Sequence, residues 1–148
     1  MNDLLVDECV LVIGAGGLLG TQVTKSALEQ GAKVIAVDLS LDNLLEKLSK
    51  EGVNTANLNL CCHSLDITVE DDVSKFFESG IEITGAVNCT YPRNKAYGAH
   101  FFDVKTSNFN ENLSLHLGSA FTFTQQCAKY FKLNKRPFSL VNISSIYG

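Results

Sequence analysis

A cluster of glycines directly after an apolar run is the first pattern in this chain that could do chemistry. Residues 9–13 (Cys-Val-Leu-Val-Ile) are apolar and largely β-branched, as is typical of a strand buried on both faces. An amphipathic helical pattern follows the glycines. This order places free backbone N–H groups and the positive end of a helix dipole where a pyrophosphate can bind. The candidate residues of the turn are Gly14, Gly16, Gly17, Leu18, Leu19 and Gly20.

A carboxylate about 20 residues later supports a ligand at this turn, since glycine spacing alone would fit an ordinary tight turn equally well. Residues 33–37 (Lys-Val-Ile-Ala-Val) predict a second buried strand, and Asp38 follows them. An acid at this place accepts hydrogen bonds from an adenosine ribose and repels a 2′-phosphate. Leu39 and the two residues after it add no cation. The sequence therefore favours NAD(H) over NADP(H), with Asp38 and Leu39 beside the ribose.

Strand and helix patterns alternate along the rest of the chain. After Asp38 we expect a helix over 41–48, a strand over 57–65, a helix from the cap Thr68 to about Ser79, a strand over 85–89, a loop over 90–105, a helix from Thr106 or Ser107 to about Lys132, and a strand over 138–143. Right-handed βαβ units of this kind predict an α/β, Rossmann-type, doubly wound parallel sheet of order 3-2-1-4-5. Residues 1–148 would form one domain.

Ligands of such a sheet bind at the carboxyl ends of its strands, where the order reverses between the first and fourth strands. The loop over 90–105 opens onto that edge and is rich in aromatic residues. Tyr91 and Arg93 would overhang the nicotinamide end of the site. Arg93 or Lys95 could pair with a carboxylate or phosphate of a sugar substrate. The alternative is that these cations are ordinary solvated surface charges.

Composition excludes several classes of partner. With 148 residues, 45% hydrophobic and 19% charged, the chain is typical of globular proteins, and its net charge of −4 without a basic run argues against nucleic acid and anionic membranes. The N-terminus has no features of a signal peptide. Five cysteines without a C-x-x-C pair fit the reducing cytoplasm. Cys61, Cys62 and His63 alternate between strand faces, so we expect no metal site.

Taken together, these motifs resemble the short-chain dehydrogenase/reductase family over essentially the whole chain. The matching segments are Gly14 to Gly20, Asp38, Leu65-Asp66-Ile67, Val87-Asn88-Cys89-Thr90, residues 109–121 and residues 141–148. A narrower resemblance is to bacterial enzymes of flagellin modification and legionaminic-type sugar biosynthesis. Residues 88–94, 112–118 and 144–148 carry that narrower resemblance.

The resemblance implies further roles. Asp66 would bond the adenine amino group and Ile67 would offer a backbone N–H, while Asn88 and Cys89 would lie beside the cofactor. Ser145 corresponds to the catalytic serine that orients the substrate oxygen, although a turn cap is the alternative. His116 stands where the family has an asparagine that helps to hold a proton-relay water at a helix irregularity. An imidazole can donate, accept and titrate near neutral pH, but His116 could equally pack between helices.

Some departures from the family pattern are as informative as the matches. Leu18 replaces a glycine and Ile13 a threonine. The family's Tyr-x-x-x-Lys, which supplies the general acid/base, is absent after residues 138–143, and Tyr147 is not followed by lysine at the required spacing. We therefore expect the N-terminal portion of a longer enzyme, ending before the later strands and inactive alone.

The function that the resemblance implies is an NAD(H)-dependent oxidoreductase. Its substrate would be a small molecule, a secondary alcohol or ketone of a sugar derivative. Relatives usually pair through the long helix, so we expect a homo-oligomer from the full-length enzyme. Two alternatives stay open, a non-catalytic dinucleotide-binding module and an interaction protein whose glycine turn is purely structural.

Overall fold

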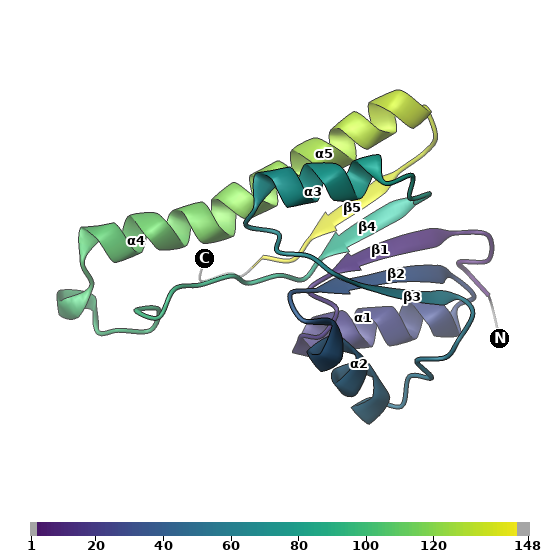
Figure 1. Ribbon diagram of the computed structural model, residues 1–148, viewed down its shortest axis with the longest axis horizontal. Coiled ribbons are helices and arrows are strands. Elements are labelled where there is room, and N and C mark those ends of the chain that lie inside the picture. Colours follow the sequence, from purple (N-terminus) through teal and green to yellow (C-terminus); the bar gives the residue numbers. More distant parts are fainter. Residues whose placement is uncertain (1–2, 145–148) are drawn as a thin grey trace.

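A parallel five-stranded sheet lies at the centre of the computed structural model, which describes residues 3–144 (Figure 1). The strands are β1 (Cys9–Ile13), β2 (Lys33–Asp38), β3 (Leu60–Ser64), β4 (Gly85–Asn88) and β5 (Ser139–Asn142). Their order is β3-β2-β1-β4-β5, and neighbouring strands are parallel throughout. The doubly wound α/β fold and the strand order expected from the sequence are thereby confirmed.

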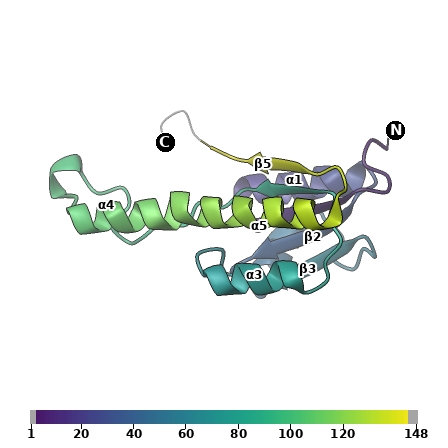
Figure 2. The ribbon, with the colours of Figure 1, turned by 90° about the horizontal axis from the view of Figure 1, so that it is seen from above.

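Helices cover both faces of the sheet (Figures 1 and 2). They are α1 (Leu18–Glu29), α2 (Leu41–Lys50), α3 (Glu70–Glu78), the short 3-10 helix η1 (Phe101–Asp103), α4 (Thr106–Leu113), the π-helix η2 (Ser114–Gly118) and α5 (Ser119–Asn134). Helices α1 and α2 lie on one face, and α3 and α5 on the other. Within residues 3–144 no helix combines the length and the apolar character needed to cross a bilayer.

The unbroken apolar run of β1 reflects its two buried faces. Leu11 and Ile13 pack into the core beneath α3 and α5, where Phe123 is fully buried. Val12 points the other way and packs with Leu44 and other residues against α1 and α2. Successive side chains of a central strand point to opposite faces of the sheet, and both faces of β1 are buried. A polar residue anywhere in the run would therefore be buried, which is why the run is entirely apolar.

The register of the sheet brings the candidate site residues to one edge. Ile13 at the end of β1 is level with Val37 in β2 and with Asn88 in β4. Asn88 is in turn level with Asn142 in β5. The loops that leave these strand ends therefore start close together, at the edge where the strand order reverses between β1 and β4.

Two local expectations from the sequence are corrected by the structure. Thr68 does not cap α3; its backbone N and Oγ1 donate to Asp66 Oδ1 at 2.9 and 2.6 Å, and Val69 precedes the helix without a side-chain cap. The third strand starts at Leu60, because Asn57 accepts a hydrogen bond from the Asn59 amide at 2.9 Å and forms a turn. In both cases an Asx side chain bonds the local backbone and diverts it from regular structure.

The long helix near the end of the chain is continuous but not uniform. Its α4 end reaches beyond the sheet, and the loop after β4 runs out along it (Figure 1). Between α4 and α5 the five residues of η2 form a π-helical turn. Such turns occur as single insertions in α-helices and are frequent at functional sites.

Candidate cofactor and substrate site

The glycine turn brings the start of α1 close to the ends of β1 and β4. Gly14 has a φ of +77°, and a Cβ built there would lie 3.0 Å from the carbonyl carbon of Cys89 and from the Thr90 nitrogen. A Cβ at Gly20 would overlap the Gly14 carbonyl oxygen. Only glycine fits at these two positions, so the pattern recognised in the sequence is required by the close approach of backbone to backbone.

The N-terminus of α1 fits an anionic group. Gly17 is its N-cap residue and provides no side-chain hydrogen bond, and no acidic residue lies in the first turn. The first amides of an α-helix have no acceptor within the helix and carry the positive end of its dipole. A diphosphate placed there would satisfy both the amides and the dipole.

Asp38 is tied directly to the glycine turn. Its Oδ2 accepts a hydrogen bond from the Gly16 amide at 2.8 Å, and its Oδ1 accepts one from the Leu39 amide at 2.8 Å. The backbone supports the same arrangement, because the amides of Gly14 and Ala15 donate to the Val37 carbonyl at 2.8 and 3.0 Å. The carboxylate therefore lies beside the glycine turn and is held there by backbone amides.

Asp66 lies at the end of the next strand. The Leu65 amide donates to the Asp38 carbonyl at 2.9 Å, so the two acidic residues follow adjacent strand ends. The Asp66 carboxylate accepts from Thr68, and Ile67 is buried in the core at 6% exposure. The acid is thus held in place by its own turn.

The Asn88 side chain holds the start of the loop that follows β4. Its side chain is buried, donates from Nδ2 to Asn142 Oδ1 at 3.2 Å and accepts from Thr90 Oγ1 at 2.7 Å and from the Thr90 amide at 3.0 Å. The Cys89 amide donates to the Ile13 carbonyl at 2.8 Å, and burial raises the pKa of the Cys89 thiol. The segment from Asn88 to Thr90 is therefore held rigidly against the ends of β1 and β5.

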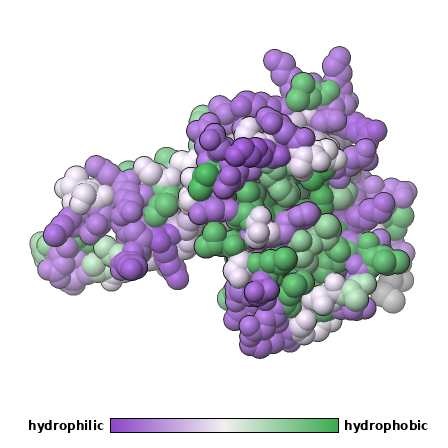
Figure 3. All heavy atoms as spheres, viewed as in Figure 1, coloured by the Kyte–Doolittle hydropathy of each residue, from purple (hydrophilic) through white to green (hydrophobic). Residues whose placement is uncertain are grey.

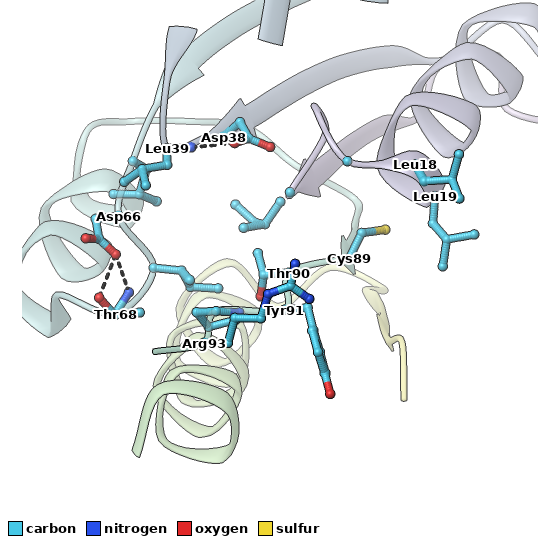
Figure 4. A pocket seen from close by; sticks show the side chains of 16 residues that line it. Leu18, Leu19, Asp38, Leu39, Asp66, Thr68, Cys89, Thr90, Tyr91 and Arg93 are labelled. Atoms are coloured by element: carbon cyan, nitrogen blue, oxygen red, sulfur yellow. Dashed lines mark hydrogen bonds between the residues drawn. The ribbon is translucent and has the colours of Figure 1, made fainter. Parts of the chain in front are cut away.

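These loops enclose a cavity of about 560 Å³ at the carboxyl edge of the sheet (Figure 4). The predicted site residues that line it are Gly14, Gly17, Leu18, Leu19, Asp38, Leu39, Asp66, Ile67, Cys89, Tyr91 and Arg93. Gly16, Gly20 and Asn88 support the lining without belonging to it. Ser145 lies outside the described residues.

The cavity has two unlike sides, to which we give names. The glycine wall consists of residues 14–20, Asp38 with Leu39, and residues 65–68. The aromatic wall consists of residues 90–93, which line the cavity, together with residues 94–97 and His116, which support them through contacts such as those of Tyr97 and His116 with the Tyr91 ring. In Figure 4, Asp38 and Leu18 approach the cavity from their own strands and helix, and Tyr91 and Arg93 lie on the other side.

His116 lies within η2, at the helix irregularity that the resemblance implied. Its ring is stacked on Tyr91, with 4.3 Å between centroids and an interplanar angle of 32°, and it lies 5.8 Å from the Tyr97 ring. Its Nε2 is buried and has no hydrogen-bond partner among residues 3–144. The Ser119 hydroxyl donates to the carbonyl oxygens of His116, at 3.2 Å, and of Leu115. The imidazole therefore contacts the Tyr91 ring through its face.

Three residues that shape the aromatic wall were given no role in the sequence analysis, although two of them, Asn94 and Asn112, lie at the ends of segments that it singled out. Tyr97 forms a hydrogen bond with the Tyr91 hydroxyl, and its ring lies edge-on to Tyr91 with 5.5 Å between centroids. The Asn94 amide donates to Asn112 Oδ1 at 2.9 Å, and Asn112 Nδ2 donates back to Asn94 Oδ1 at 3.0 Å. No spacing rule links residues 18 positions apart in a loop and a helix. Only the concentration of aromatic residues in the loop could have indicated Tyr97.

This chain matches known proteins of a single family. A family model described as short chain dehydrogenase matches residues 8–148. The chain is 30% identical over 151 residues to post-translational flagellin modification protein A of Campylobacter coli, covering 98% of this chain and 58% of that relative. It is 27% identical over 147 residues to a 3-oxoacyl-(acyl-carrier-protein) reductase of Thermotoga maritima, covering 97% of this chain and 58% of the reductase.

A solved structure has the same fold over nearly all of this chain. A short chain dehydrogenase from Leptospira borgpetersenii serovar Hardjo-bovis, determined with bound NAD+, matches with a TM-score of 0.80 at 22% identity. The match covers 97% of this chain and 53% of that one. The chain thus spans little more than half the length of these relatives.

Proposed function

The chain belongs to the short-chain dehydrogenase family, and from that premise we propose that it holds NAD(H) in the cavity at the carboxyl edge of its sheet. The activity we assign to the enzyme is oxidation of an alcohol or reduction of a ketone. The observation that carries the proposal is the hydrogen bond between the Asp38 carboxylate and the Gly16 amide, at 2.8 Å. It supports the proposal because it holds a carboxylate that could accept from a ribose beside a turn whose amides could bind a diphosphate.

Each part of the dinucleotide has a matching group in the cavity. The amides at the start of α1 would hold the diphosphate, and Asp38 the adenosine ribose. Asp66 and Ile67 would flank the adenine, and Asn88 and Cys89 would close the cavity at the nicotinamide end. When bound, the cofactor supplies or accepts the hydride. Ser145 would orient the substrate oxygen beside it.

We assign NAD(H) rather than NADP(H) on charge and hydrogen bonding. The Asp38 carboxylate would repel a 2′-phosphate. The next residue is Leu39, whose side chain is 69% exposed and offers no positive charge. Arg93 is the only cation among the described residues that line the cavity, and it lies on the aromatic wall, on the opposite side from Asp38. A 2′-phosphate would therefore be repelled by Asp38 and would have no cation on that side of the cavity to pair with.

Titration calorimetry with NADH and NADPH tests this assignment. We expect NADH to bind at least about tenfold more tightly than NADPH, a difference of ~1.4 kcal/mol. Asp38→Asn should remove that preference, because the amide no longer repels phosphate. Asp42→Asn, an acidic residue in the first turn of α2, is the matched control and should leave both affinities unchanged. Equal affinities of the unmodified protein for the two cofactors would refute the assignment.

For the substrate we propose a sugar derivative of a surface or flagellin glycan. The support is the 30% identity to a flagellin modification protein and the motifs shared with that branch. A non-catalytic dinucleotide-binding module is the second candidate, favoured by His116, which stands where the family has the asparagine that helps to hold a proton-relay water. NADH oxidation with sugar ketones by the purified enzyme separates the two candidates.

We also propose that the enzyme forms a homo-oligomer through its long helix. Four apolar side chains spaced four residues apart lie exposed along α4, η2 and α5: Phe109, Leu113, Leu117 and Phe121. Their spacing places them on one face of the helix. On the face of the molecule seen in Figure 3, the part of the long helix that reaches beyond the sheet is mostly hydrophilic. Light scattering of the purified protein tests the proposal, and a monomer at micromolar concentration would contradict it.

A further inference from the structure

Arg93 is held at the aromatic wall by two tyrosine rings. Its guanidinium carbon lies 5.9 Å from the centroid of the Tyr91 ring and 5.6 Å from that of Tyr97. Both distances are within the range of a cation–π interaction. The two tyrosine hydroxyls are hydrogen-bonded to each other, and the His116 ring packs against both tyrosine rings. The positive charge is therefore held beside two tyrosine rings that His116 supports.

The loop that carries Arg93 is also held by hydrogen bonds to α4. Besides its reciprocal bonds with Asn112, Asn94 donates from Nδ2 to the Asn108 carbonyl at 3.2 Å and to Glu111 Oε2 at 2.6 Å. Four hydrogen bonds thus join the residue after Arg93 to α4. A cation on a loop held in this way is preorganised, so little conformational freedom is lost when it binds a ligand.

Among the residues that the structure describes, no acidic side chain forms an ion pair with Arg93. Within residues 3–144 the ion pairs are Lys50 with Glu46 and Lys75 with Asp72, and neither involves Arg93. The acid in the nearby helix, Glu111, is engaged by Asn94. The cavity is therefore polarised, with two carboxylates on the glycine wall and a free guanidinium on the aromatic wall.

We propose that Arg93, held between Tyr91 and Tyr97, is the anion-recognition group of the substrate pocket, so that the substrate carries a phosphate or carboxylate group. The inference rests on the proposed function and deepens it by naming the class of substrate. A guanidinium binds such groups through two parallel N–H donors, which a lysine cannot do. Tyr91, Tyr97 and His116 act as positioning residues for that fork.

The cofactor diphosphate is another anion that Arg93 could reach, and the test must separate the two. Saturating the purified protein with NAD+ occupies the cofactor site first. Glucose 6-phosphate and glucose then serve as matched probes, because they differ only in the anionic group. Titration calorimetry measures the affinity for NAD+ and, in the saturated protein, for each sugar.

We expect glucose 6-phosphate to bind at least about tenfold more tightly than glucose, as charge-assisted hydrogen bonds contribute on this scale. Arg93→Gln should abolish that preference and leave the affinity for NAD+ unchanged. Lys95→Gln, which removes an exposed cation two residues away, is the control and should keep the preference. Tyr97→Leu should reduce the preference about two- to fivefold through loss of one cation–π face, and Tyr97→Phe should restore most of it.

Three outcomes would overturn the inference. The first is equal binding of the two sugars, and the second is an equal loss of preference in the two charge variants. The third is a weakening of NAD+ binding by Arg93→Gln that matches its effect on glucose 6-phosphate, which would assign Arg93 to the cofactor. Failure of the unmodified protein to bind NAD+ would refute the proposed function itself, and the first titration would reveal it before any sugar is added.

Discussion

The glycine wall and the aromatic wall face the same cavity but are held in place by different kinds of contact. On the glycine wall the contacts are mostly between backbone groups, such as the Gly14 and Ala15 amides with the Val37 carbonyl. On the aromatic wall they are between side chains distant in sequence, such as Asn94 with Asn112 and Tyr91 with His116. The first kind of wall accepts few substitutions, and the second can change its side chains without changing the fold.

This difference fits different roles for the two walls, with the glycine wall binding the cofactor and the aromatic wall the substrate. A dinucleotide has the same diphosphate and ribose in every enzyme, so a rigid backbone cradle is suited to it. Substrates vary, and a wall built from side chains on a loop can vary with them. We therefore expect changes on the glycine wall to affect folding and cofactor affinity together. Changes on the aromatic wall should affect substrate recognition and leave the affinity for the cofactor unchanged.

The largest expected effect comes from Gly20→Ala on the glycine wall. The new Cβ would overlap the Gly14 carbonyl oxygen, so α1 would have to move away from the end of β1. We expect a loss of about 3 kcal/mol in the free energy of unfolding, at the upper end of the cost of overpacking. The affinity for NADH should fall with it. Urea denaturation and calorimetry measure the two quantities.

Gly118→Ala is the matched control for this variant. Gly118 lies in η2, and a Cβ built there meets no atom within 4 Å. Alanine in a helix is favoured over glycine by about 0.5–1 kcal/mol, so this variant should be neutral or slightly stabilised. If both variants lose the same stability, the close approach of Gly20 to Gly14 is not what makes the glycine wall intolerant.

A smaller effect is expected from Asn94→Ala on the aromatic wall. The substitution removes three side-chain hydrogen bonds to α4, from Nδ2 to Asn108 and Glu111 and from Asn112 to Oδ1. Because the site is half-buried, we expect a loss of about 1–2 kcal/mol in the free energy of unfolding. The affinity for NADH should stay unchanged. A fall in that affinity as large as the one caused by Gly20→Ala would show that the two walls are not independent.

The double variant with Asn112→Ala sharpens this test. If the two asparagines stabilise the loop mainly through each other, the double variant should lose little more stability than Asn94→Ala alone. Additive losses would instead mean that each asparagine acts through separate partners. Urea denaturation of the two single variants and the double variant gives the coupling energy directly.

The same contrast explains how far the sequence could predict this molecule. The fold and strand order followed from the alternation of apolar segments, because β1 and β2 show their burial on both faces in consecutive residues. The glycine turn and Asp38 could be paired because backbone geometry fixes their separation. The partners of Asn94 and Tyr97 could not, since they depend on where a long helix passes a loop. The cap at Thr68 was wrong because the Thr68 amide and hydroxyl donate to the Asp66 carboxylate in a local turn, and the helix begins only after Val69.

The smallest expected effect concerns Cys89, which lies where the two walls meet and lines the cavity. Burial raises the pKa of its thiol, so the reactive thiolate is scarce at neutral pH and increases as the pH rises toward and beyond its ordinary value. Alkylation by iodoacetamide should therefore be slow at pH 7 and accelerate with pH. NADH at about ten times its dissociation constant should slow the reaction about tenfold, because only the free protein then exposes the thiol.

Cys61 provides the internal control for that measurement within the same molecule. It is exposed on the edge strand β3, outside the cavity lining, so NADH should not change its rate of alkylation. Mass spectrometry of digested samples follows both cysteines at once. Protection of Cys89 alone would place the cofactor against the junction of the walls. Equal protection of both cysteines would mean that NADH stabilises the whole fold instead. The proposal that the cofactor acts locally, at the glycine wall and Cys89, would then be contradicted.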